Sequence, residues 1–470
     1  MAGTRYFSPR FPPNLTGVGW RLFVFKELRS REFRDPLILT AFAQSDPSRC
    51  MSMNPIVREP IVITGIGLLA SVGLDRESVW EAVRQGESRF EHLHGMRGIN
   101  DGEIVGATVD LGTPLEGRLK VLPMCERAAD EAVRDAGLDL SQIEPRRFGC
   151  MIAGHMGDTR WVEQQLGLPS GDTGNYNWWE QWLPDTACSM LARRYGALGP
   201  KLCHSTACAS SLISVLTAAR AIRDGQCDIA LAGGGDSIDP MFVAGFNQMR
   251  VLAKDDDPSR ACRPFDRTRK GFVFGEGSAM FVVERLGHAL RRGARIYAQI
   301  SAAKSLAQAH HVTSIDTESD ALVHLMGLAM DEAHLDPADI GYINAHGTGT
   351  EQNDAAEAAG IRQVFGNDIG HTCVSATKSS LGHMLNSAGA AELAITALAM
   401  RDGFAPPTLN LTDPDPICNF DCLPLVGRTN QFQHALKLSL AFGGHLVAVL
   451  LSRWNDAATG YAYPEIRKAA

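Results

Sequence analysis

The sequence has no excess of basic residues and no long apolar run. Its 45 lysine and arginine residues are outnumbered by 53 acidic residues, which gives a net charge of −8 at neutral pH. Proteins that bind nucleic acid or anionic membranes usually carry a basic surface, and no segment here approaches the ~20 apolar residues of a membrane span. We therefore expect no nucleic acid partner and no membrane span.

Cysteines at recognisable spacing are also lacking. The eleven cysteines are too few for a disulfide scaffold, and their odd number leaves at least one thiol free. The closest pairs, Cys203/Cys208 and Cys418/Cys422, do not have the spacing of zinc ligands. We therefore expect a cytoplasmic protein with free thiols and no metal site.

The first 58 residues show no helical or strand period that lasts. We interpret residues 1–58 as an N-terminal extension that is disordered, or that reflects a start codon upstream of the true one at Met51 or Met53. A signal peptide is the weaker alternative, because the apolar run Leu37–Ala43 is short and follows a long charged stretch.

From Pro60 onward, apolar segments typical of buried strands alternate with segments of helical period. The strand patterns include residues 60–70, 147–154, 227–237 and 434–452, and the helical patterns include residues 75–86, 121–138, 211–225 and 390–403. This alternation predicts an α/β fold with a mostly parallel sheet covered by helices. The segments 228–236 and 436–444 both lead an apolar strand into glycines, which indicates duplication of one α/β unit.

Two cysteines stand in similar surroundings, Cys208 in STACASS and Cys188 in PDTACSM. Cys208 precedes a helix pattern of small apolar residues that must be buried, and a strand-like segment leads into it. A helix start favours the thiolate, so we predict a nucleophile with a thiolate at neutral pH. Cys188 precedes a charged amphipathic helix, and we interpret it as a small buried apolar residue.

Further reactive side chains lie in small-residue segments of the second half. His346 follows a strand pattern in NAHGTGT, and Lys378 and His383 lie in the glycine- and serine-rich segment SATKSSLGHMLNSAGAAE. A single histidine is more often structural. Two histidines and a lysine in such segments, together with a cysteine at a helix start, indicate a catalytic site.

These segments carry a family resemblance. STACASS, PFDRTRKGFVFGEGSA, NAHGTGT, ATKSSLGHMLNSAGAAE and AFGG occur in the order found in the β-ketoacyl-acyl-carrier-protein synthases, type II condensing enzymes of the thiolase superfamily. The resemblance runs from about Ile61 to Ser452, and the interval to His346 matches Cys208 rather than Cys188 to the family's nucleophile. It implies a thiolase-like fold, a duplicated five-layer αβαβα architecture, with halves at 59–300 and 301–453 and a tail at 454–470.

The resemblance also implies roles for individual residues. Cys208 would accept an acyl group, and His346 and His383 would stabilise the enolate left when malonyl-acyl-carrier protein loses CO₂. Lys378 and Glu392 would form a buried pair, and the backbone N–H groups of Cys208 and Phe442 would form the oxyanion hole. Substrate contacts would come from the following residues: Thr348, Thr350, Phe442, Phe246 and Met156. No cofactor is needed, and the partners implied are acyl carrier protein and a second copy in a homodimer.

Three departures from the family pattern are visible. The segment before AFGG has Lys437 and Leu438 where relatives usually have Ser-Asn, which helps to hold a structural monovalent cation beside residues that match Asn344 and Glu392. We predict that the Lys437 ammonium replaces that ion opposite Glu392; the alternative is a lysine that points to solvent. His445 follows the glycines where relatives have Thr, and residues 174–182 (GNYNWWEQW) are either core or a specialised acyl lid.

The leading interpretation is therefore a condensing enzyme of fatty acid biosynthesis. The alternatives are a condensing enzyme of a specialised lipid or polyketide pathway and, with less support, a non-catalytic subunit that sets chain length. Such a subunit typically lacks the nucleophile, whereas this sequence keeps Cys208 and both histidines. A thiolase would need a second cysteine near AFGG, and the sequence has none there.

Overall fold

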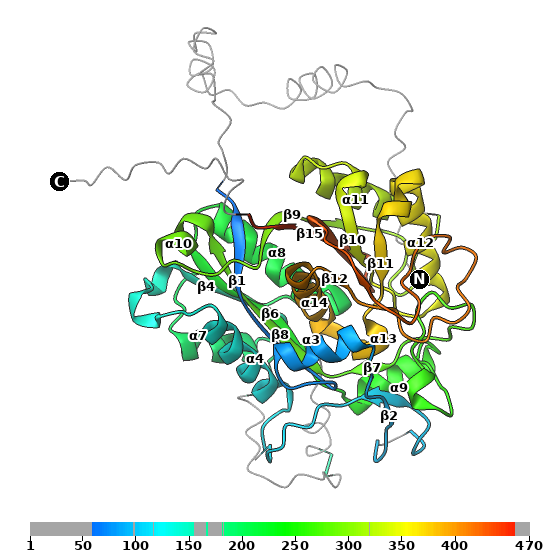
Figure 1. The fold of residues 1–470 in the computed structure, drawn as a ribbon. Helices are drawn as coiled ribbons and strands as arrows, with labels where there is room; N and C mark the ends of the chain where they lie inside the picture. Colours follow the sequence, from blue (N-terminus) through cyan, green and yellow to red (C-terminus); the bar gives the residue numbers. More distant parts are fainter. Residues whose placement is uncertain are drawn as a thin grey trace, which may run out of the picture. The chain divides into compact units, whose positions relative to one another are not determined.

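The computed structural model describes residues 59–96, 99–115, 117–154, 166–167, 181, 183–318 and 320–455. Ten strands of this part form one mixed sheet in which two sets of five follow each other (Figure 1). In order across the sheet, the first set is β1 (Ile61–Ala70), β8 (Gly277–Arg285), β6 (Ile229–Asp236), β4 (Phe148–Ile152) and β5 (Lys201–Leu202). The second set is β9 (Ala298–Ala307), β15 (His445–Arg453), β14 (His434–Ala441), β10 (Ile340–Asn344) and β11 (Cys373–Ser375).

The two sets repeat one topology. If the five strands of each set are numbered in chain order, their order across the sheet is first, fifth, fourth, second and third in both sets. The directions repeat as well: β1–β8 and β9–β15 are antiparallel, whereas β4–β5 and β10–β11 are parallel. β6 and β14, whose glycine endings indicated a duplication, occupy equivalent places. The predicted duplicated thiolase-like fold is confirmed.

The predicted strand directions need correction. The sheet is mixed rather than mostly parallel, and β1, which we expected to be parallel, runs antiparallel to both β8 and β9. β14 and β15 are joined by a tight turn at residues 442–444, so they must also be antiparallel. A continuous apolar run records burial on both faces, and it carries no information on the direction of a partner more than 200 residues away.

Helices cover the strands in three layers (Figure 1). The outer layers are α4 (Val121–Asp135) with α7 (Thr186–Tyr195), and α11 (Ala321–Ala333) with α12 (Glu351–Phe365). The middle layer is α8 (Ser210–Arg223) with α14 (Ala388–Asp402), which contact each other and strands of both sets. Shorter helices are α3 (Arg76–Gln85), α9 (Pro240–Gln248), α10 (Leu286–Arg291) and α13 (Lys378–Leu381).

Side-chain alternation along the strands builds the core on both sides of the sheet. In β6, Ala230 and Ala232 join the central core around α8 and α14, whereas Ile229 and Leu231 join the core beneath α4 and α7. Because successive residues of a strand face opposite sides, each set of strands lies between two helix layers. This gives the five layers that the resemblance implied.

Small elements complete the described part. β2 (Glu91–His92), β3 (Val105–Ala107) and β7 (Phe274–Gly275) form a three-stranded sheet, and β12 (Phe404–Ala405) pairs with β13 (Arg428–Thr429). No helix in the residues described reaches the length and apolarity that a membrane crossing requires.

Candidate active site

Cys208 lies at the turn between β5 and α8. A short 3₁₀ turn, Ala207–Ala209, leads directly into α8, and Ala207 has a φ of 48°. Positive φ is uncommon and strained for a residue with a side chain, and such strain is concentrated at functional sites. The Ser439 hydroxyl of β14 donates to the Cys208 carbonyl at 3.2 Å and fixes this turn against the second strand set. The predicted strand-to-helix elbow is present.

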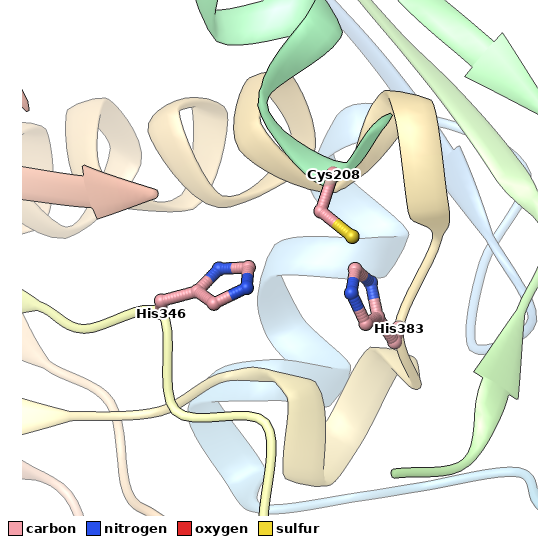
Figure 2. Close-up of side chains that lie close together, drawn as sticks. All are labelled: Cys208, His346 and His383. Carbon is pink, nitrogen blue, oxygen red and sulfur yellow. The ribbon is translucent and has the colours of Figure 1, made fainter. Parts of the chain in front are cut away.

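The two histidines come from the second half of the chain and meet at this sulfur (Figure 2). His346 follows the end of β10, and His383 lies between α13 and α14. Ligand atoms of Cys208, His346 and His383 all lie within 4.8 Å of one another, and all three residues are buried. The imidazole rings meet edge to face with their centroids 5.5 Å apart.

Hydrogen bonds to the far nitrogens fix the tautomer of both rings. The Lys378 ammonium, which can only donate, lies 3.3 Å from His346 Nδ1. The backbone N–H of Leu385 donates to His383 Nδ1 at 3.2 Å. Because each Nδ1 accepts, each neutral ring carries its proton on Nε2. The site therefore holds two Nε2–H donors, as the resemblance implied.

Buried lysines flank Glu392 on both sides. Lys378 Nζ lies 2.5 Å from Glu392 Oε1, so the predicted buried pair is present. Lys437 is fully buried, and its Nζ lies 2.6 Å from Glu392 Oε2. The prediction that the Lys437 ammonium faces Glu392 is confirmed, and the alternative of a solvent-facing lysine is wrong. Within the glycine- and serine-rich segment, Lys378 lies on the short helix α13.

Burial keeps the reactive groups neutral. It lowers the pKa of both His346 and His383 well below the ordinary value, and the nearby Lys378 ammonium adds to the shift. Burial also raises the pKa of the Cys208 thiol to about 12, against a smaller lowering by Lys378. A helix start favours the thiolate by at most about 2 kcal/mol, or roughly 1.5 pKa units. Burial therefore opposes the thiolate that we predicted at the start of the helix.

Two adjoining cavities lead to the sulfur. An outer cavity of about 640 Å³ is lined by Arg250, Lys270 and Thr350 among others, and an inner cavity of about 40 Å³ contains Cys208 and both histidines. Phe442 and Thr350 line both cavities. Because one water needs roughly 10–15 Å³ of such space, the inner cavity holds no acyl chain in this conformation.

Four of the five predicted substrate residues lie around the inner cavity. Phe246 stacks on Phe442 with ring centroids 6.0 Å apart, so the two rings form one aromatic wall. The Thr348 and Thr350 hydroxyls lie 2.9 Å apart on the same cavity. Met156 and, apart from Gln181, the tryptophan-rich segment 174–182 lie outside the described residues.

Glu357 is a site residue that the sequence did not reveal to us. Its carboxylate accepts the backbone N–H groups of His346 and Gly347, both at 2.6 Å, and the Asn353 side chain at 3.0 Å. It therefore fixes the loop that carries His346, and burial raises its pKa to about 7. Two polar residues at positions i and i+4 on an alanine-rich helix face were the available signal.

The other candidate cysteine is separate from this site. Cys188 lies inside α7, fully buried, with its Sγ 3.9 Å from Cys150 Sγ. It is the small buried residue that we expected. The thiol and imidazoles around Cys208 are of the kinds that bind zinc, but both Nε2 atoms carry protons in the tautomers set here, so these atoms donate hydrogen bonds rather than coordinate a metal.

Comparison with known proteins places this geometry in a family. Residues 120–289 match the family described as "Beta-ketoacyl synthase, N-terminal domain", and residues 297–412 match "Beta-ketoacyl synthase, C-terminal domain". Together the two matches cover more than half of the chain and include Cys208, His346 and His383.

Relatives match over nearly their whole length. The tetracenomycin polyketide synthase ketoacyl synthase alpha subunit of Streptomyces glaucescens is 34% identical over 84% of this chain and 97% of its own. The 3-oxoacyl-(acyl-carrier-protein) synthase 2 of Coxiella burnetii is 34% identical over 84% of this chain and 99% of its own.

Solved structures agree. The AntDE:AntF complex, a type II polyketide synthase acyl-carrier protein with its ketosynthase, superimposes with a TM-score of 0.78 at 29% identity, covering 84% of this chain and 100% of the other. The ishigamide ketosynthase/chain length factor gives 0.76 at 29% identity, covering 85% and 100%. From its sequence matches, its fold and the cysteine with two histidines at its centre, the chain belongs to the β-ketoacyl synthase family of condensing enzymes.

Proposed function

We propose that this condensing ketosynthase extends an acyl chain held on Cys208 by decarboxylative condensation with a malonyl-acyl-carrier protein, in a polyketide or other specialised pathway. The observation that carries the proposal is the meeting of one thiol and two Nε2–H donors within 4.8 Å in a buried cavity. A thiol alone would serve many acyl transfers. Two neutral donors beside it suit a reaction in which negative charge develops on a thioester oxygen.

The first half-reaction transfers the acyl group. The Cys208 sulfur attacks the carbonyl of an acyl-carrier thioester, the carrier sulfur leaves, and the Cys208 proton ends on the carrier thiol. Backbone N–H groups of Cys208 and Phe442 are the proposed donors to the tetrahedral oxyanion.

The second half-reaction forms the carbon–carbon bond. The bond to the malonyl carboxylate breaks, CO₂ leaves, and the electron pair forms an enolate of the carrier thioester. Nε2–H groups of His346 and His383 donate to the enolate oxygen, and the enolate carbon attacks the acyl carbonyl on Cys208. The Cys208 sulfur then leaves and recovers a proton, which gives a β-ketoacyl chain two carbons longer.

The comparisons favour a specialised pathway over fatty acid biosynthesis, which was our leading interpretation. Most of the relatives carry names of polyketide synthase subunits, while the protein from Coxiella burnetii is a 3-oxoacyl-(acyl-carrier-protein) synthase 2. Solved neighbours include ketosynthases with an acyl-carrier protein and with a chain length factor. We therefore propose an acyl carrier protein as the substrate carrier for this chain.

A non-catalytic chain-length subunit is the second candidate. Related complexes contain a ketosynthase together with a chain length factor. The presence of Cys208 and both histidines in one buried site supports the catalytic role, because a subunit that only shapes the cavity needs none of these groups.

Mass spectrometry with acyl-carrier proteins of several chain lengths tests the proposal. We expect the acyl mass on the peptide that contains Cys208, no acylation of C208A, and unchanged acylation of C203A, which removes a nearby half-buried thiol. Malonyl-carrier protein should then release CO₂ and give an extended product. Repeated extension without reduction would support a polyketide pathway, and absence of acyl-Cys208 with every carrier would refute a catalytic role.

A further inference from the structure

The side chain of Lys437 ends in an enclosure in which its ammonium contacts three oxygen atoms. Lys437 lies in β14 with no exposed surface, and its Nζ contacts Glu392 Oε2 at 2.6 Å, the Ala345 carbonyl at 3.1 Å and the Asn344 carbonyl at 3.4 Å. The side-chain oxygen of Asn344 is also buried and has no hydrogen-bond partner. Carbonyl and carboxylate oxygens are the ligands that hard metal cations prefer.

The same carboxylate connects this enclosure to the active site. Glu392 Oε1 accepts from Lys378, whose ammonium also donates to the His346 carbonyl at 2.6 Å and lies 3.3 Å from His346 Nδ1. The Lys378 ammonium finds three acceptors for its N–H groups, whereas Lys437 donates to two carbonyls and forms an ion pair with Glu392 Oε2. A continuous series of contacts therefore runs from Lys437 through Glu392 and Lys378 to the far side of the His346 ring.

We propose that Lys437 is a positioning residue that acts as a built-in cation. Its ammonium neutralises the outer oxygen of Glu392, so that this carboxylate holds Lys378 against His346 Nδ1 and keeps the His346 proton on Nε2, facing Cys208. A structural monovalent cation, which the family resemblance implied for this position, does not fit here because the ammonium takes its place. The proposal rests on the proposed function only for its catalytic readout.

The surroundings of Lys437 make its charge sensitive to pH. The charged and titratable groups around it are Glu392 on α14, Lys378 on α13, Glu357 on α12, His346 and His383 in the loops, and Tyr342 on β10. Burial lowers the pKa of Lys437 and the Lys378 ammonium adds to this effect, while Glu392 and Glu357 oppose it; the net result is a pKa of about 8. We therefore expect the charge of Lys437 to decrease in mildly alkaline solution.

Two substitutions separate the charge of Lys437 from its volume. K437S empties the enclosure and exposes its oxygens to a small ion, whereas K437M fills it with an uncharged chain of similar length. Thermal unfolding is compared in potassium chloride and in tetramethylammonium chloride at equal ionic strength, because the larger cation cannot enter. The release of CO₂ from malonyl-carrier protein is measured across pH in the same salts.

We expect K437S to unfold at a higher temperature in potassium than in tetramethylammonium, and the wild type and K437M to show no such difference. K437M should release CO₂ about tenfold more slowly, as is usual for lost outer contacts of a catalytic ligand. It should also lose the decline that the wild type shows above about pH 8. K304M, which removes a partly exposed lysine paired with Glu332 on the other side of the sheet, should behave as the wild type.

Either of two results would overturn the proposal. One is a wild type that itself gains stability from potassium over tetramethylammonium. The other is K437M with the rate and pH profile of the wild type, and this outcome is decisive even if K437S fails to fold. The unfolding comparison involves no catalysis, so it tests the role of Lys437 even if the proposed condensation is wrong. Failure of the proposed condensation would be seen separately, as wild-type Cys208 that carries no acyl group.

Discussion

At the scale of single residues, the chemistry depends on which nitrogen of each imidazole carries the proton. Lys378 and the Leu385 N–H occupy the two Nδ1 atoms, so both Nε2–H bonds are directed into the cavity of Cys208. A protonated ring would leave its Nδ1–H against a donor. The tautomer of each ring, its neutral state and its burial therefore depend on one another, and protonation of a ring disrupts the whole arrangement.

This arrangement predicts acid sensitivity. The unfolded chain protonates His383 below its ordinary pKa of 6.5, whereas the folded chain excludes that proton because burial lowers the pKa. The unfolded state then binds more protons, so the free energy of unfolding falls as pH decreases, by up to about 1.4 kcal/mol per pH unit for one such group. Above pH 6.5 both states hold His383 neutral, so His383 adds no pH dependence to the free energy of unfolding. We expect H383N to lose less stability than the wild type between neutral and acidic pH in denaturant titrations.

H324N is the matched control, because His324 is exposed on α11. It should follow the wild-type pH dependence. Parallel curves for the wild type and H383N below pH 6.5 would contradict a neutral, buried His383.

Sequence reasoning identified the reactive residues but not their ionisation. Cys208, His346 and His383 stand in distinctive small-residue segments, and Lys437 was visible as a departure beside an expected carboxylate. The state of the thiol depends on how much solvent is removed from it, and this is a property of the packed structure. The sequence did not show that Glu357 accepts the backbone N–H groups of His346 and Gly347, although its i, i+4 relation to Asn353 was visible.

At the scale of elements, the contact between α8 and α14 positions the nucleophile. A Cβ atom added at Gly389 of α14 would lie 2.8 Å from Leu212 Cβ and 3.3 Å from Leu212 N, both on α8. These atoms are attached to the backbone and cannot rotate away. Leu212 lies one helical turn after Cys208, so a displacement of α8 moves the sulfur as well.

We expect G389A to destabilise the protein despite the better helix propensity of alanine. Overpacking costs about 1–3 kcal/mol, and alanine recovers at most about 1 kcal/mol over glycine. Denaturant midpoints should fall, and Cys208 acylation should slow. G327A in α11, where an added Cβ meets no atom within 4 Å, should instead raise the midpoint. A G389A midpoint above that of the wild type would show that the two helices can separate without loss.

The turn between β14 and β15 carries Phe442, which we propose as a gate between the two cavities. Phe442 lies between the outer and inner cavities and stacks on Phe246. We expect F442A to join the two cavities, so that long acyl chains acylate Cys208 faster and the difference in rate between short and long chains decreases. Initial acylation rates by mass spectrometry measure this.

F420A removes a half-buried ring that packs on Phe265, away from both cavities, and serves as the control. It should leave the chain-length preference unchanged. An unaltered preference in F442A would mean that the gate lies elsewhere.

Element boundaries were predictable from periodicity, and strand partners were not. The helical pattern at 75–86 became α3 with Asp75 and Gly86 as its caps, and the pattern at 211–225 became α8. Pairing between β1 and β8 joins segments more than 200 residues apart, and their direction depends on the whole topology.

At the scale of the whole molecule, the first repeat supplies the sulfur and the second supplies both imidazoles. The two ends of the ten-stranded sheet differ: β11 is buried, whereas β5 is exposed. Leu202 in β5 and Leu198 just before it are 43% and 69% exposed. In the described part of the chain, β5 pairs with β4 on one side only, and such a short edge strand can pair with a second chain.

We therefore predict that a second copy pairs at β5. Light scattering should give a dimer for the wild type, and L198E/L202E should give a folded monomer because the substitutions place like charges at the shared edge. L140E, at an exposed leucine far from β5 in sequence, is the control and should remain a dimer. A monomeric wild type that dimerises only with a co-expressed chain length factor would contradict the homodimer and favour a mixed pair.

The lysine enclosed beside Glu392 has a consequence for where such an enzyme can work. Because this positive charge is covalently part of the polypeptide, dilution, chelators and changes in the potassium concentration of the medium cannot remove it. A metal ion, however, has no proton to lose, whereas this amine does. We therefore expect the enzyme to be independent of the salt in the medium, but to have an upper limit to the pH range in which it works.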